Sequence, residues 1–363
     1  MSSEIPAPPP VEPPLHRHGL APIALSLALG AVGGAVFAYL NVPLPWMLGA
    51  IVANTIAAVR GWPVMIPHTV RVIVISIVGV FLGASFSPDM LDRLAAWAGS
   101  LSLMFVFIPL VTLIASEYFR RFAGFDQATA IFSGAPGTLT AMVIVGGSSG
   151  GDERLITLAQ GLRAMLVVMV LPNIVAVLVG HPEAIQVTAS ESSAVSPEAV
   201  WLIGAAVTGF VVAQVLNLPA IAMATSMVVT AALYLAGAVT WHAPDPVFQA
   251  ALWILGSSIG SRFAIASAAT FFRVSRHAIV ATGVVIMVSA AFAGVASLLT
   301  GTPYLTSFLS FTPGGVAEMC LIAIAFDIDP TFVAVHHLLR IAILVTLLPI
   351  GAKLFLRMTH RKA

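Results

Sequence analysis

The segment FTPGGVAEMCLIAIAFD, residues 311–327, places a proline, two adjacent glycines and a glutamate inside a strongly apolar chain. A membrane-spanning helix cannot keep all its backbone hydrogen bonds through such a segment. Unpaired backbone groups are tolerated at membrane depth only where protein buries them or where they line a wet cavity. The segment therefore predicts a broken helix beside a polar site. A second segment of this kind, SGAPGTLTAMVIVGG, occupies residues 133–147.

The composition is typical of a polytopic membrane protein. The chain has 363 residues, of which 59% are hydrophobic and only 9% charged, and its mean hydropathy is +1.02. Soluble domains carry about 25% charged residues. Apolar runs of about 20 residues recur, each long enough to cross a hydrocarbon core of about 30 Å. A β-barrel would instead show short alternating segments, so we expect an all-α fold.

The content of charged residues, cysteines and motifs disfavours several functions. The net charge of +1 indicates no direct nucleic-acid partner, and the single cysteine, Cys320, excludes an internal disulfide or a CxxC metal site. His336 and His337 are adjacent and would point about 100° apart on a helix, so they cannot chelate as an i, i+4 pair. No phosphate-binding loop, HExxH or GxSxG motif occurs. We expect no enzymatic activity, no metal and no cofactor.

A tandem duplication becomes visible when the chain is compared with itself. Identical residues recur 177 positions apart, pairing Pro136 with Pro313, Gly137 with Gly314, Met142 with Met319, Arg163 with Arg340 and Pro172 with Pro349. One shared register favours duplication over coincidence among apolar runs. The expected organisation is a disordered Pro-rich cytoplasmic tail (1–19), membrane repeat 1 (20–180), an acidic polar linker (181–197), membrane repeat 2 (198–357) and a basic cytoplasmic tail (358–363).

Each copy is expected to contain five spans with a Pro-Gly segment before the last one. The spans are about 20–40, 44–60, 69–86, 94–118 and 155–179, then 199–216, 219–240, 247–263, 278–300 and 331–356, with Pro-Gly segments at 127–147 and 304–326. If these segments cross the bilayer the copies are parallel, and if they re-enter the copies are inverted. The inverted arrangement places twelve Lys and Arg residues in the cytoplasm and only Arg93 outside, whereas the parallel one gives nine against four. We therefore expect an all-α protein of about ten transmembrane helices, with inverted repeats, two broken or re-entrant segments and cytoplasmic termini.

The candidate substrate-binding residues lie at the two breaks and on the last span of each copy. At the breaks they are Pro136, Gly137, Thr138, Thr312, Pro313, Gly314 and Gly315, followed by Glu318, and on the last spans they are Arg163, His337 and Arg340. Ionisable groups inside a membrane usually mark a function or a charge pair. Two roles suit Arg163 and Arg340: they are either ligands of an anion or partners of Glu318 and of the carbonyls at the breaks. His337 shares a helix face with Arg340, although a packing role is the alternative, and Arg262 could snorkel at the end of its span.

The repeats resemble those of the membrane AbrB family. TPGGVAEM (312–319) and HHLLRIAILVTLLP (336–349) match the family pattern closely, GAPGTLTAM (134–142) and QGLRAMLVVMVLP (160–172) match less well, and PLPWMLGAI (43–51) is similar to its opening. Thr138 and Ala141 stand where the second copy has Gly315 and Glu318. The resemblance implies a polytopic protein of the bacterial inner membrane. Family members are variously labelled regulators of gene expression, ammonia monooxygenases or transporters.

These labels can be weighed against the residues. A copper or iron oxygenase needs convergent histidines or carboxylates, which makes that label the weakest. Our leading expectation is a transporter-like protein that binds or moves a small solute, with an anion favoured by the arginines, and in which Glu318 couples to protons or an ion. The alternative is a membrane-embedded regulator that senses a ligand or docks a partner and alters expression indirectly. The expected partners are the lipid bilayer and an unknown small molecule, and homo-oligomerisation stays open.

Overall fold

The computed structural model describes residues 19–86, 96–179, 196–216, 219–265 and 268–360, and these residues form helices and no strand. The tail at 1–18, most of the expected linker and the last three residues lie outside the described part of the chain. The first copy contains α1 (Leu20–Tyr39), α2 (Pro45–Val59), α3 (His68–Ala84), α5 (Ala98–Phe122), α6 (Gln127–Gly134), α7 (Leu139–Ser148) and α8 (Glu153–Val179). The second contains α9 (Ala199–Leu216), α10 (Pro219–Leu235), α11 (Asp245–Ser261), a short 3₁₀ turn (Arg262–Ile265), α12 (Ala268–Thr300), α13 (Tyr304–Phe311), α14 (Val316–Ala325) and α15 (Pro330–His360).

The prediction of an all-α polytopic membrane protein is confirmed. Each of the ten expected spans corresponds to a helix, and the helices α1, α5, α8, α9 and α12 are long and apolar enough to cross a membrane. Shorter apolar helices correspond to four of the other expected spans, at α2, α3, α10 and α15. The fifth corresponds to α11, which has 17 residues. The largest difference is that α12 begins at Ala268 rather than near 278, because the basic sequence FFRVSRH continues the helix beyond its apolar part.

The two copies repeat element by element. The short helices α6 and α13 have eight residues each, α7 and α14 have ten each, and both pairs are separated by the sequence offset of 177. Packing between the copies is reciprocal, because α2 packs on α11 while α3 packs on α10. In the same way α12 contacts α8 while α5 contacts α15. Such swapped pairs indicate an approximate two-fold relation between the copies.

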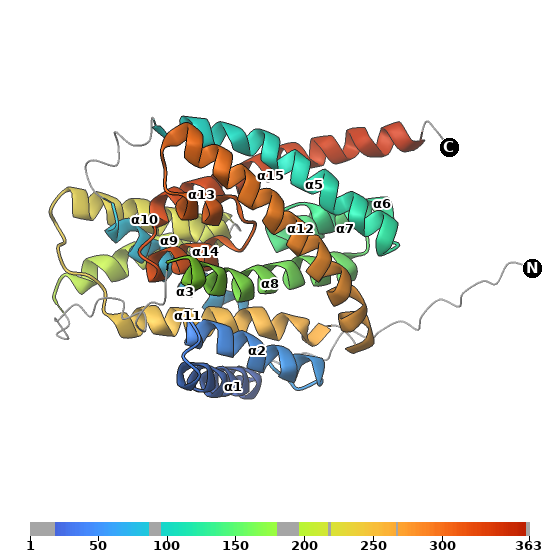
Figure 1. Ribbon diagram of the computed structural model, residues 1–363. Helices are drawn as coiled ribbons and strands as arrows, with labels where there is room; N and C mark the ends of the chain where they lie inside the picture. The colour runs from blue at the N-terminus through green and yellow to red at the C-terminus, as the bar shows by residue number, and fades with distance from the viewer. Residues whose placement is uncertain (1–18, 87–95, 180–195, 217–218, 266–267, 361–363) are drawn as a thin grey trace, which may run out of the picture.

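The corresponding helices α5 and α12 run in opposite directions in the view of Figure 1. There α5 runs from left to right and is followed by α6 on the right, whereas α12 runs from right to left. The segment α6–α7 turns back on itself, because the backbone N–H of Asp152, just before α8, donates to Thr129 Oγ1 in the first turn of α6 at 2.8 Å. The two ends of this segment therefore lie next to each other.

Glycines allow the reciprocal helix pairs to pack closely. A Cβ placed on Gly79 in α3 would lie 2.4 Å from the carbonyl oxygen of Met223 in α10. A Cβ placed on the equivalent Gly256 in α11 would lie 2.4 Å from the carbonyl oxygen of Met47 in α2. Small residues are the usual means by which membrane helices approach one another closely. Gly79 and Gly256, which are also 177 residues apart, thus both lie at contacts between the two copies.

A single carboxylate ties two connecting segments together. Glu198, just before α9, accepts hydrogen bonds from the backbone N–H groups of Thr240 at 2.8 Å and Trp241 at 2.9 Å, in the connection between α10 and α11. These two donors hold the pKa of the Glu198 carboxyl below its ordinary value of 4.5, because they stabilise the charged form.

Burial differs sharply between the two short helices that follow the breaks. In α14, every residue from Ala317 to Ala323 is buried, and the helix packs against α3, α8, α11 and α15. In α7 only Met142 and Gly146 are buried, and Ile144 is 64% exposed. The second break therefore lies in the centre of the bundle, as Figure 1 shows for α14, whereas α7 presents an apolar face outward.

Candidate functional site

The two breaks have the same local geometry. Ala135 and Thr312 end α6 and α13 in extended backbone conformations, which is what a following proline imposes. One residue further, Gly137 N–H donates to the Ala135 carbonyl at 2.8 Å and Gly314 N–H donates to the Thr312 carbonyl at 2.9 Å. Pro136 and Pro313 are both buried at these turns. The sequence repeat is therefore also a repeat of backbone conformation.

Arg163, on α8, binds the first break. Its Nη1 donates to the Ala135 carbonyl at 2.9 Å, and its Nη2 contacts the Gly137 carbonyl at 3.4 Å and Gln160 Oε1 at 2.7 Å. Gln160 itself donates to the carbonyls of Phe132 at 2.5 Å and Ala135 at 2.9 Å. The carbonyls left unpaired at the C-terminal end of α6 thus receive side-chain donors.

Arg340, on α15, binds the second break in the same manner. It donates to the Thr312 carbonyl at 3.4 Å and to the Gly314 carbonyl at 2.8 Å. His337 occupies the position of Gln160 but does not replace its contacts. Its ring is fully buried and neither nitrogen makes a well-formed hydrogen bond, although the Ser310 carbonyl lies near it. Of the alternatives for the arginines, pairing with the break carbonyls is present and pairing with Glu318 is not.

Glu318 lies in the first turn of α14 and folds back over Gly315. A Cβ placed on Gly315 would lie 2.0 Å from Glu318 Oε2, so the glycine leaves the space that the carboxylate occupies. This contact explains why the first copy differs at two positions together. There Thr138 replaces the glycine and Ala141 replaces the glutamate, and without a carboxylate the larger residue is accommodated.

The charge partner of Glu318 comes from the other copy. Its Oε1 lies 3.9 Å from Arg71 Nη2 on α3, and the Glu318 side chain is 5% exposed against 27% for Arg71. Arg262, at the end of α11, also interacts electrostatically with Glu318 and Arg71. Arg71 Nε and Arg262 Nη2 are buried without a hydrogen-bond partner. Arg262 therefore points its charge into the protein instead of simply snorkelling, and the cluster carries two guanidinium groups for one carboxylate.

The predicted threonines contribute little side-chain hydrogen bonding at the breaks. Thr138 begins α7 without a side-chain cap, and the Thr312 hydroxyl donates to the carbonyl of Phe308 in its own helix at 2.7 Å. Sequence reasoning missed the roles of Arg71, Ser133 and Thr282, described here and below. Arg71 lies close to the end of its predicted span, where a basic residue is expected at the interface, so no sequence signal marked it.

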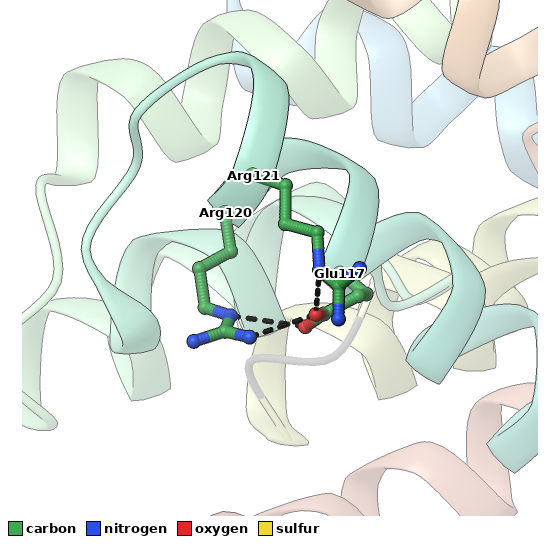
Figure 2. A network of polar contacts seen from close by, with 3 residues as sticks. All are labelled: Glu117, Arg120 and Arg121. Atoms are coloured by element: carbon green, nitrogen blue, oxygen red, sulfur yellow. Dashed lines mark hydrogen bonds and ion pairs between the residues drawn. The ribbon is translucent and has the colours of Figure 1, made fainter.

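Glu117, on α5, forms its ion pairs at the surface and not at the first break. Glu117 binds Arg120, with Arg120 Nη2 2.7 Å from Glu117 Oε1, and also binds Arg121 one turn along the same helix. Figure 2 shows the two guanidinium groups converging on this carboxylate. All three side chains are at least 40% exposed. Glu117 therefore belongs to the surface, and it does not pair with Arg163.

The described residues contain no group of three or more His, Cys, Asp or Glu side chains placed to hold a metal ion. What the breaks offer is a pair of buried guanidinium groups, backbone carbonyls and several hydroxyls. Arg163 is 9% exposed and Arg340 is 2% exposed, and Arg340 lies close enough to Arg163 to be affected by its charge.

These features define a polytopic helical membrane protein built from two copies of a broken-helix unit. A family profile described as "Transition state regulatory protein AbrB" matches residues 46–356, so the chain belongs to the AbrB family. It is 28% identical to "Uncharacterized protein YhjN" of Bacillus subtilis (strain 168), over 89% of this chain and 90% of that protein. It is 23% identical to "Putative regulator AbrB" of Escherichia coli (strain K12), over 92% of this chain and 95% of that protein.

Proposed function

We propose that the protein binds a small anionic solute between its two copies and moves it across the bacterial inner membrane. One observation carries the proposal. Arg163 and Arg340 are buried, come from different copies, and have no carboxylate within ion-pair distance among the described residues. A buried charge without a counter-charge costs several kcal/mol, and break carbonyls offset only part of that cost. An anion between the arginines would supply the missing negative charge.

The topology in this proposal is inverted, with both termini in the cytoplasm. The opposite directions of α5 and α12 in Figure 1 support it, as does the return of the α6–α7 segment to Asp152. Secondary transporters of inverted repeats place their solute beside discontinuous helices near the midplane, and the two breaks here would form such a site. The residues assigned to the solute are those at the breaks together with Arg163, His337 and Arg340. Glu318, which lies beside Arg71, is assigned to coupling with protons or an ion. The solute is not chemically converted.

A second candidate function is favoured by the names of the relatives. The family description and the Escherichia coli protein's name both refer to a regulator. In this version the same site senses a ligand, and gene expression responds indirectly through a partner. The two candidates share a binding step and differ in whether the ligand crosses the membrane.

Binding and flux are measured separately on the purified full-length protein. Thermal unfolding against a panel of small organic and inorganic anions should reveal a stabilising ligand, because a ligand at 100 times its dissociation constant stabilises by about 2.7 kcal/mol. The stabilisation should be lost in Arg163→Lys and Arg340→Lys and kept in Arg120→Lys, which alters only the surface network of Figure 2.

Proteoliposomes then decide between the two functions. Gradient-driven uptake of the stabilising anion supports transport, and binding without uptake supports the regulator. If no anion stabilises the folded wild-type protein, the proposed anion site is wrong and the arginines serve the backbone alone.

A further inference from the structure

A small cavity lies beside Arg163, enclosed by α5, α6, α8 and α12. Its polar lining comes from Ser133, Arg163 and Thr282, and its apolar walls include Ala115, Phe119 and Val285. The free volume is about 10 Å³, which is room for one group the size of a water molecule. The cavity thus combines side chains from both copies, since α12 belongs to the second.

Several polar atoms of the residues around this cavity have no hydrogen-bond partner. Ser133 Oγ, Thr282 Oγ1 and Arg163 Nε are all unpaired, and so is the Oγ of Ser116, which lies against the cavity-lining Gly134. The four residues are at most 9% exposed. Buried donors normally find a partner, because leaving one unpaired costs about 1–3 kcal/mol. Four unpaired groups at one small cavity therefore point to an occupant that accepts hydrogen bonds.

The second copy lacks this arrangement. Ser310, the equivalent of Ser133, donates to the Thr306 carbonyl in its own helix at 2.7 Å. At the offset of 177, Ser116 corresponds to Ala293, and Thr282 corresponds to Phe105. Unpaired hydroxyls also occur elsewhere, for example at Ser307 in α13 and Thr331 in α15. The first break differs in that the unpaired Ser133 and Thr282 line one cavity together with Arg163.

We propose that this cavity binds a small monovalent anion, of the size of a halide or the head of formate, held by Arg163 Nε and the hydroxyls of Ser133 and Thr282. The unpaired polar groups of the lining residues can all donate hydrogen bonds, and one of them carries a positive charge that no carboxylate neutralises among the described residues. Glu117, the acidic neighbour of Ser116, is bound to Arg120 and Arg121 at the surface. This inference rests on the proposed function, because both involve Arg163. It adds the chemical class of the solute and a subsite at which the solute binds.

The test uses purified full-length protein in detergent. Thermal unfolding is followed in sodium gluconate while sodium chloride, sodium bromide or sodium formate replaces it at constant ionic strength. The wild-type protein should show a saturable rise in Tm. In Ser133→Ala and in Thr282→Val the dissociation constant should rise at least about ten-fold, because each variant lacks one hydrogen-bond donor to a charged ligand. Ser310→Ala is the matched control and should bind like the wild type.

Two outcomes would overturn the proposal. The first is no saturable stabilisation by chloride, bromide or formate in wild-type protein that unfolds cooperatively in gluconate. The second is equal stabilisation of Ser133→Ala, Thr282→Val and wild type, which would place any bound anion elsewhere. The flux assay separates this inference from the function. Binding that depends on Ser133 and Thr282 without flux supports the cavity and refutes transport, whereas anion flux that is insensitive to both substitutions supports transport and refutes the cavity.

Discussion

Arg163 and Arg340 donate through the same guanidinium nitrogens to carbonyls at the same two distances in sequence. Nη1 reaches the carbonyl 28 residues earlier, and Nη2 reaches the one 26 residues earlier, in both copies. Each arginine therefore belongs structurally to the break that it contacts, and a duplicated sequence has preserved a duplicated hydrogen-bond unit.

Loss of this unit should destabilise the protein. Arg340→Met keeps most of the side-chain volume but removes the donors for the Thr312 and Gly314 carbonyls. The unpaired acceptors cost about 2 kcal/mol, and removal of a buried charge that no carboxylate neutralises offsets part of this cost. We therefore expect the free energy of unfolding to fall by at most about 2 kcal/mol. Arg120→Met, on the exposed end of α5, is the control and should unfold like the wild type. Thermal unfolding in detergent checks this, and an unchanged Tm for Arg340→Met would contradict it.

Gly315 and Glu318 should be energetically coupled. Gly315→Ala forces the Glu318 carboxylate to move, since the new Cβ would lie 2.0 Å from Oε2, and the displacement disturbs its contact with Arg71. We expect a loss of about 1 kcal/mol. The same substitution made in Glu318→Ala should cost less, as in the first copy, where neither residue is present. Unfolding of both single variants and the double variant gives the coupling energy, and strict additivity would refute the contact.

Acid should weaken the contact made by Glu198. Its pKa is lower in the folded protein than its ordinary value of 4.5, so the carboxylate adds stability above that pH. This contribution is lost as the pH falls through the folded pKa. The Tm of the wild-type protein should therefore drop more steeply below pH 4.5 than that of Glu198→Gln. Parallel Tm profiles for the two proteins would show that the hydrogen bonds to Thr240 and Trp241 do not contribute.

Topology can be tested with single cysteines after Cys320→Ala. Ser85, Ser148 and Arg276 are exposed. In the inverted arrangement a membrane-impermeant maleimide should label Ser85→Cys in intact cells, and should label Ser148→Cys and Arg276→Cys only after permeabilisation. The parallel arrangement places the last two outside. Labelling of both from outside would thus refute inverted repeats, with Ser85→Cys as the positive control.

Local sequence was sufficient to predict the helices and the breaks. Apolar length located the spans, and a proline followed by glycine located each break, because both effects act within a few residues of the chain. The predicted register of the duplication is matched by the bounds of α6, α7, α13 and α14. Arg163 and Arg340 recur at the same sequence offset, which marked them as residues of the breaks. The sequence left two alternative roles for them, as ligands of an anion or as partners of Glu318 and the break carbonyls.

Contacts between distant helices could not be predicted in the same way. Arg71 is brought to Glu318 by the packing of α3 on α14, and no local pattern specifies that packing. Ser133 and Thr282 are ordinary residues for membrane helices, where hydroxyls usually bond to their own backbone. Only the tertiary structure distinguishes Ser133, whose hydroxyl is free, from Ser310, whose hydroxyl is bonded.

The reciprocal packing of α2 on α11 and of α3 on α10 has a consequence for biosynthesis. When the ribosome has finished the first copy, Gly79 still lacks the helix against which it packs, and Arg163 still lacks the α12 wall of its cavity. The first copy therefore remains in the bilayer with polar groups uncovered until α10, α11 and α12 have been synthesised and inserted. Co-expression of residues 1–197 and 198–363 as separate chains should accordingly protect each from proteolysis, while either chain alone should be degraded.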